Sequence, residues 1–417
     1  MIQNRTYKDL SNTILLFILI YMPLFNFKIL NKFYFFPTLI FLFIFLFNFR
    51  AFIQINIRII YFIILLSILP IIYSGIIHVL LPPRVYPSFG SLVFIKTLIN
   101  LFYGFAFALI FSFYLLKYGI DDVYNWIINI GILQSVFTII MILFPNVKDF
   151  IFHQILYYNI NDPIFLPHVY IFRIFGIGSG HLFSLSMAQG LISCISILMY
   201  LRVKKSIYLV FVPFLILPVV VNARIGLVPI FFYMLLLVTK GLFYLKREEI
   251  STVVKIIIIF SILFIAVYYI NISIKLIDFD KYIFWFSREF DSNQINNISV
   301  LRSHSFFPQN AIHFMFGEGR YIFALDRFIH SDIGYIIDLH FGGITYILLS
   351  YSGLIALNIV AIKYSSRNHE NILFISILIS TFVVNIKGQI FNYNNYTFLV
   401  YMIYYNYLLR INKTLKS

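Results

Sequence analysis

The chain has 417 residues, of which 61% are hydrophobic, 20% aromatic and only 11% charged, and its formal net charge is +15 at pH 7. Because soluble domains contain about a quarter charged residues, this composition excludes a water-soluble fold. The length allows roughly a dozen transmembrane helices of about 20 residues each, with one sizeable loop left over. Most basic residues lie at the ends of apolar runs, so the positive charge indicates membrane topology and no nucleic acid is expected as a partner.

Twelve apolar runs are predicted to be transmembrane helices, because backbone amides in hydrocarbon have to be hydrogen-bonded within their own segment. The predicted helices cover residues 13–27, 33–49, 59–80, 92–116, 123–144, 182–201, 206–221, 225–239, 252–270, 343–362, 371–387 and 393–410. The expected fold class is therefore an all-α polytopic integral membrane protein, in which residues 1–417 form a single membrane domain. Cys194 is the one cysteine in the sequence, so no intramolecular disulfide can form.

Lysine and arginine residues between the predicted helices indicate the orientation of the chain. With the N-terminus inside, the inner connections include the basic clusters at 202–205 and 240–247, whereas the short outer connections carry few basic residues. Cytoplasmic loops of membrane proteins are enriched in Lys and Arg, so this bias predicts that both termini lie in the cytoplasm.

Two of the predicted outer connections are long, and they cover residues 145–181 and 271–332. The second is the extended polar stretch of the sequence, yet it contains aromatic residues such as Tyr282 and Trp285 between its charges. A disordered tether would lack such residues, so we expect this large outer loop to fold against the membrane. Functional residues are expected in these two segments.

Arg224 lies between two apolar runs of only about 15 residues, which span roughly 22 Å and fall short of the ~30 Å hydrocarbon core. We therefore expect Arg224 to lie at a recessed outer turn. It is either a functional cation or an interfacial residue whose side chain extends to the headgroups. A single helix with Arg224 at its centre would place the basic cluster at 240–247 outside, which the charge bias disfavours.

Two further cations lie at the outer ends of predicted helices. Arg173 opens a stretch that contains Gly176 and Gly178, and glycines and helix N-terminal amides favour the close approach of an anion. The glycine spacing matches neither the dinucleotide-binding nor the P-loop pattern, so packing of the loop is the alternative. Lys387 ends the eleventh predicted helix, where it either binds substrate or extends to the headgroups.

The densest group of chemically active side chains lies at residues 316–335, next to a predicted membrane helix. Its candidate residues are Glu318, Arg320, Arg327, His330 and Asp332. Arginines, a histidine and carboxylates at the outer membrane surface can hold a phosphate ester and move a proton. For His330 the alternative is an ordinary surface histidine. No histidine spacing typical of metal ligands occurs in the sequence, so no metal site is expected.

The order of these motifs along the whole chain is similar to that of a known family. The motifs are Arg173 with its glycines, residues 222–225 (Asn-Ala-Arg-Ile), residues 316–319 (Phe-Gly-Glu-Gly), residues 330–335 (His-Ser-Asp-Ile-Gly-Tyr), Gly342 with Gly343, and Lys387 with Gly388. In this plan the sequence resembles the Wzy-type O-antigen polymerases and, more loosely, the O-antigen ligases of the same superfamily.

The resemblance implies a metal-independent glycosyltransferase without a cofactor, in the inner membrane of a bacterium. Its substrates would be undecaprenyl-diphosphate-linked oligosaccharides, which it would join at the periplasmic face. A chain-length-regulating co-polymerase and membrane lipid are the other implied partners.

The implied chemistry assigns roles to the candidate residues. The diphosphate leaving group gains negative charge, and arginine binds phosphate through two parallel hydrogen bonds. The expected substrate-binding residues are therefore Arg173, Arg224, Arg320, Arg327 and Lys387. A sugar hydroxyl that attacks has to lose a proton, for which the candidate acceptors are His330, Asp332 and Glu318, in that order.

Two other functions remain as alternatives. A flippase or other transporter for lipid-linked oligosaccharides has a similar length, but its charges would lie within helices around a central cavity and its loops would be short. The long segment 271–332 favours the polymerase. An O-antigen ligase differs in its acceptor, which a single sequence does not reveal.

Overall fold

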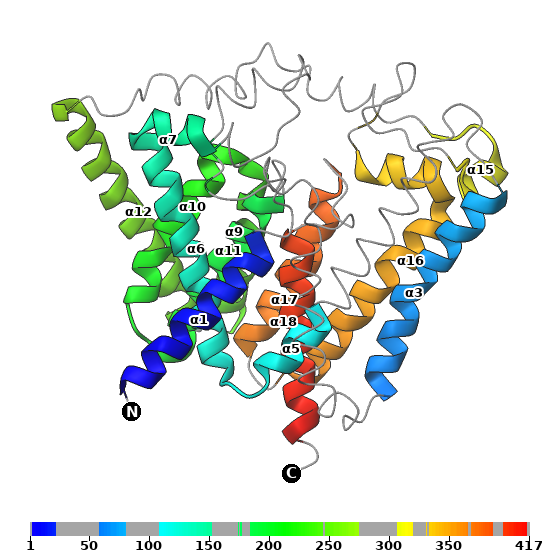
Figure 1. The fold of residues 1–417 in the computed structure, drawn as a ribbon, viewed down its shortest axis with the longest axis horizontal. Coiled ribbons are helices and arrows are strands. Elements are labelled where there is room, and N and C mark those ends of the chain that lie inside the picture. Colours follow the sequence, from blue (N-terminus) through cyan, green and yellow to red (C-terminus); the bar gives the residue numbers. More distant parts are fainter. Residues whose placement is uncertain are drawn as a thin grey trace. The chain divides into compact units, whose positions relative to one another are not determined.

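The computed structural model describes residues 2–21, 58–80, 108–151, 174, 176, 184–244, 247–274, 307–319, 331, 333–365, 368–386 and 395–414. Within these ranges the regular elements are helices, and no strand occurs (Figure 1). Four of the described helical stretches are long and apolar enough to cross a membrane: Ile120–Leu143, Ser184–Val203, Arg224–Phe243 and Gly334–Lys363. The described part of the chain is therefore that of an all-α protein with helices suited to a membrane.

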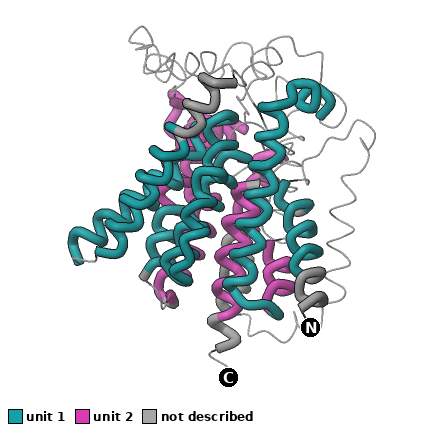
Figure 2. Tube along the Cα trace, turned by 90° about the vertical axis from the view of Figure 1, so that its left-hand side faces the viewer, with its two compact units in different colours: residues 1–43, 117–290, 367–377 teal, residues 44–116, 291–366, 378–417 magenta. Residues whose placement is uncertain are grey.

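The chain divides into two compact units, which Figure 2 colours separately. The first unit comprises residues 1–43, 117–290 and 367–377, and the second comprises residues 44–116, 291–366 and 378–417. The candidate residue Arg224 belongs to the first unit and the candidate residue Glu318 to the second.

The helices of the first unit are α1 (Ile2–Tyr21), α6 (Ile120–Leu143), α7 (Pro145–Phe150), α9 (Ser184–Val203), α10 (Ile207–Asn222), α11 (Leu227–Phe243) and α12 (Arg247–Ile274). A short 3-10 turn, η3 (Arg224–Gly226), separates α10 from α11. The second unit contains α3 (Arg58–Leu80), α5 (Ala108–Leu115), α15 (Ala311–Phe316), α16 (Gly334–Tyr364) and α18 (Asn395–Thr414). Helix α17 (Asn368–Val384) contributes residues up to Ile377 to the first unit and the rest to the second.

The positions of the apolar runs in the sequence agree with those of most described helices. The predicted run 33–49 lies outside the described residues, and each of the other predicted runs overlaps a described helix. Helix α16 consists of two helices that meet at a kink at Gly343, so the predicted start at 343 coincides with the start of the second of them, and the first, from Gly334, was not predicted. Asp338 and His340 interrupt the apolar run there, but both are buried inside the unit, where protein contacts replace lipid. The total of twelve crossings stays a prediction.

Helix α9 is the centre of the first unit. Every residue from Ser184 to Leu201 is buried, and the helix packs against α6, α10 and α11. Its Gln189 side chain donates to the Gly131 carbonyl (3.0 Å) and accepts from the Tyr21 hydroxyl (2.7 Å), which ties α9 to α6 and α1. A Cβ on Gly190 would lie 2.0 Å from the Gly226 carbonyl oxygen, so glycine is required where α9 meets η3. Small and polar residues of this kind are typical of helix contacts in membranes.

In the second unit α3 runs alongside α16, and α18 packs against α5 and α16 (Figure 1). The Ser112 hydroxyl donates to the Met402 carbonyl (3.1 Å), and the Asn358 amide donates to the Tyr404 hydroxyl (2.5 Å). Helix α16 is not continuous, because Gly343 has φ 69° and ψ −172°. This break lies against α15 and the residues that follow it, where Glu318 is located.

Candidate functional site

Two of the residues that the sequence analysis selected, Glu318 and Arg224, lie in the described part of the chain. The others lie outside the described residues: Arg173, Arg320, Arg327, His330, Asp332 and Lys387. Their assignments stay predictions.

Glu318 lies in a short loop that is bound to the broken part of α16. The Glu318 amide donates to the His340 carbonyl (2.8 Å), and the Gly319 amide donates to the Phe341 carbonyl (3.0 Å). The break at Gly343 interrupts the helical hydrogen-bond pattern just after these two carbonyls, which would otherwise bond to amides one turn further on. The loop therefore takes the place of the missing helical turn.

Glycines allow this loop to approach α16 closely. Gly317 has φ 83°, and a Cβ on it would lie 2.5 Å from the Gly342 Cα. A Cβ on Gly343, which has φ 69°, would lie 2.4 Å from the Met315 carbonyl. The Tyr73 hydroxyl contacts the carbonyls of Gly342 (3.0 Å) and Phe316 (3.1 Å) and so joins α3 to the same place. We call this arrangement of residues 315–319 on residues 340–343 the glycine clamp.

The clamp places the Glu318 carboxylate between two histidines. His340 Nδ1 is 3.5 Å from Glu318 Oε2, and His313 Nδ1 is 3.6 Å from Glu318 Oε1. The three side chains differ in exposure: 6% for His340, 24% for Glu318 and 47% for His313. A carboxylate at this position can accept a proton from a hydroxyl group and has an imidazole on either side.

Sequence reasoning missed His340. His340 was not selected because it lies next to the apolar run of a predicted helix and 22 positions after Glu318. The signal that was present is the stretch 338–343, in which Asp and His precede two glycines in front of a membrane helix. Polar residues of this kind near membrane helices are commonly functional.

Arg224 begins η3, at the turn between α10 and α11, and is half-buried. Ala223 is extended (φ −150°, ψ 116°) and ends α10, so the chain does break at the predicted place. The neighbouring Asn222 is fully buried, and within the described part of the chain neither atom of its side-chain amide has a hydrogen-bond partner. Buried polar atoms without partners are rare in folded proteins, so this turn has unused hydrogen-bonding capacity beside a cation.

Two residues that follow Arg173 in the sequence, Ile174 and Gly176, lie in the described part of the chain. The amide of Ile174, the next residue in the sequence, donates to the Val221 carbonyl (3.2 Å). Gly176 has φ 66°, and a Cβ on it would lie 2.4 Å from Gln134 Nε2. The close approach at Gly176 is therefore made to a protein side chain.

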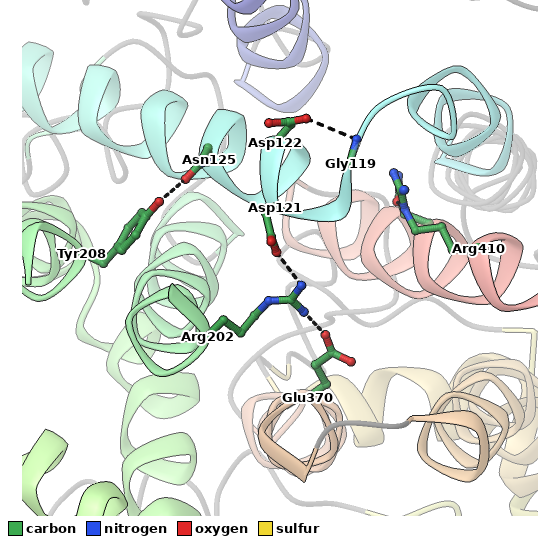
Figure 3. A network of polar contacts seen from close by, with 9 residues as sticks. Gly119, Asp121, Asp122, Asn125, Arg202, Tyr208, Glu370 and Arg410 are labelled. Atoms are coloured by element: carbon green, nitrogen blue, oxygen red, sulfur yellow. Dashed lines mark hydrogen bonds and ion pairs between the residues drawn. The ribbon is translucent and has the colours of Figure 1, made fainter. Parts of the chain in front are cut away.

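A buried ion-pair network in the first unit was not expected from the sequence (Figure 3). Arg202, in the last turn of α9, contacts Asp121 (2.5 Å) at the start of α6 and Glu370 at the start of α17. Its guanidinium also lies over the Tyr124 ring, 5.8 Å from the centroid. From the sequence, Arg202 was expected to be one of the basic residues that mark the cytoplasmic side of the membrane. In the structure its side chain is only 5% exposed and lies in an ion pair. The location of these charges at helix ends, where they complement the helix dipoles, indicates a structural role.

No family model, curated protein or solved structure matches this chain. Within the described ranges, no group of three His, Cys, Asp or Glu residues is arranged to hold a metal ion.

Proposed function

We propose that the chain is an O-antigen polymerase of the bacterial inner membrane. It joins undecaprenyl-diphosphate-linked oligosaccharide repeat units into polysaccharide at the periplasmic face, as a metal-independent glycosyltransferase. Both termini lie in the cytoplasm, about twelve helices cross the membrane, and the segments 145–181 and 271–332 are periplasmic. A chain-length-regulating co-polymerase is the expected protein partner.

The observation that carries this proposal is the Glu318 carboxylate, held by the glycine clamp between two imidazoles. Glycosyl transfer to a sugar hydroxyl needs a proton acceptor in a fixed position. The backbone of Glu318 is bound to α16 through its own amide, and its side chain is partly exposed, so an acceptor hydroxyl can reach it. We therefore place Glu318 first among the proton acceptors, ahead of His330 and Asp332.

The second requirement of the reaction is a set of cations for the departing diphosphate. Ile174, the residue after Arg173 in the sequence, donates a hydrogen bond from its amide to the Val221 carbonyl at the end of α10, three residues before Arg224. Arginine is the side chain best suited to a diphosphate, because it binds phosphate oxygens in pairs. Arg224 and Arg173 are proposed to bind the diphosphate, together with Arg320, Arg327 and Lys387.

The buried charges of the first unit lie at helix ends. Arg202, Lys240, Glu249 and Glu370 are buried or largely buried, but each lies in the first or last turn of its helix. Transporter sites in membranes lie near the middle of the bilayer, on broken or facing helices. These ion pairs stabilise helix ends instead.

A strain that lacks this gene tests the function directly. We expect its surface-polysaccharide ladder to collapse to a single repeat unit attached to lipid A core, because flipping and ligation continue without polymerisation. The wild-type gene should restore the ladder. Loss of every repeat unit would contradict the proposal and indicate a flippase or a ligase. The side of the membrane on which lipid-linked units accumulate would then decide between those two.

Replacement of Arg224 tests the diphosphate site. Arg224→Ala is expected to lower the polymerisation rate by about 10²- to 10³-fold, the effect of removing one donor that stabilises transition-state charge. Arg224→Lys should recover part of the rate, because it keeps the charge and loses the paired hydrogen bonds. Polymer length and rate are measured with purified protein in vesicles, with lipid-linked units from the deletion strain as substrate.

The matched control is Arg247→Ala, which removes an exposed arginine at the start of α12. It should leave the rate unchanged. An Arg224→Ala protein that polymerises at the wild-type rate would remove Arg224 from the site.

A further inference from the structure

The two histidines beside Glu318 differ in a way that the proposed reaction can use. Each polymerisation step removes a proton from the acceptor hydroxyl, and the diphosphate leaves as an anion that does not need that proton. A proton acceptor therefore has to release its proton to water before the next cycle. We infer that His313 is the proton-relay residue that carries this proton from Glu318 to the outer solution, and that His340 is the positioning residue that holds the carboxylate. This inference rests on the proposed function.

The exposures support this division of roles. The His313 side chain is 47% exposed, on the short helix α15, so its ring can exchange protons with water. The His340 side chain is 6% exposed, inside α16. Glu318 lies between the two, with each of its carboxylate oxygens directed to a different ring. Of the two histidines beside Glu318, only His313 is therefore exposed enough to pass a proton to water.

The distances suit transfer of a proton after a small adjustment. His313 Nδ1 and Glu318 Oε1 are 3.6 Å apart, and a movement of about half an ångström brings them to hydrogen-bond distance. Catalytic hydrogen bonds are commonly long before substrate binds and shorten in the complex. The backbone at both residues is fixed, because the Gly317 amide donates to the His313 carbonyl (2.8 Å) and the Glu318 amide donates to the His340 carbonyl (2.8 Å).

The transfer step exchanges one bond of the anomeric carbon for another. The acceptor hydroxyl oxygen forms a bond to the anomeric carbon of the donor sugar, while the bond from that carbon to the diphosphate oxygen breaks. The bonding electron pair leaves with the diphosphate, which gains one negative charge. The hydroxyl proton passes to Glu318, then to His313 and then to water, so that Glu318 is ionised again for the next acceptor.

His340 meets Glu318 in two ways, although its side chain is only 6% exposed. Its backbone carbonyl accepts the Glu318 amide, and its ring lies 3.5 Å from the carboxylate oxygen that does not contact His313. The backbone hydrogen bond fixes the main chain of Glu318, and the ring lies beside its carboxylate. Loss of the His340 ring should therefore misplace the carboxylate, and an external base should not restore it.

Chemical rescue separates the relay from a purely structural role. We expect His313→Ala, in vesicles with lipid-linked units from the deletion strain, to polymerise about 10²-fold more slowly than wild type. Imidazole added to the outer solution should restore most of the rate, because the exposed position admits a small base. His340→Ala should also be slow, but imidazole should not restore it. Ile312→Ala, which removes a more exposed, non-ionisable side chain from the same helix, should match wild type with and without imidazole.

The outcomes distinguish the relay from the proposed function. His313→Ala at the wild-type rate, or a slow His313→Ala that imidazole does not restore although the protein is folded by size-exclusion chromatography, overturns the relay. If wild type polymerises and Glu318→Gln does not, these results leave the polymerase itself intact. A wild-type protein that forms no polymer from lipid-linked units overturns the polymerase and the relay together.

Discussion

Glu318→Gln is expected to abolish most polymerisation, with a rate about 10²- to 10⁴-fold below wild type. The amide keeps the size and shape of the carboxylate but cannot accept the hydroxyl proton. The backbone hydrogen bonds of the glycine clamp do not involve the side chain, so the variant should fold. The measurement is the rate of chain extension in vesicles, followed by the length distribution of the product on a gel. In cells the same variant should give a single repeat unit on lipid A core.

Two comparisons make this result specific. Glu248→Gln makes the same chemical change at a half-exposed glutamate in the other unit, where its partner is Lys204, and should leave the rate unchanged. Glu318→Asp keeps the charge but withdraws it from both histidines, so its rate should fall between those of wild type and Glu318→Gln. A Glu318→Gln protein with wild-type activity would exclude this carboxylate as the proton acceptor.

Arg202→Met is expected to destabilise the protein by about 3–5 kcal/mol, which is the cost of breaking a buried ion pair from one side. The Glu370 side chain is 4% exposed and would be left as a buried negative charge. Methionine keeps much of the volume and packing of the arginine stem, so the loss reports on charge more than on shape. The free energy of unfolding is measured by denaturant titration in detergent micelles.

Two variants check the cause of that loss. Arg202→Met combined with Glu370→Leu removes both buried charges and should be clearly more stable than Arg202→Met alone. Lys204→Met breaks the half-exposed pair with Glu248 and should cost less than about 1 kcal/mol. If the double variant were as unstable as the single one, packing rather than the unpaired charge of Glu370 would explain the effect.

Much of the helical plan was predictable because helix formation in a membrane depends on local composition. A run of apolar residues has to satisfy its own backbone, so helices such as α6, α9 and α10 begin and end within a few residues of the predictions. The break before Arg224 was predictable for the same reason, since two short apolar runs flank it. Glu318 was selected because it lies in a polar stretch between glycines.

The sequence by itself therefore determined the all-α class with helices suited to a membrane and the positions of most described helices, because these follow from residues close together in the chain. The tertiary structure alone decided which side chains meet. Arg202 finds Glu370 across 168 positions, Gly176 packs on Gln134, and His340 contacts Glu318 only because α16 breaks at Gly343. Such contacts depend on how separate helices pack, and the hydrophobic pattern of one segment carries no information about the partner that another segment brings to it.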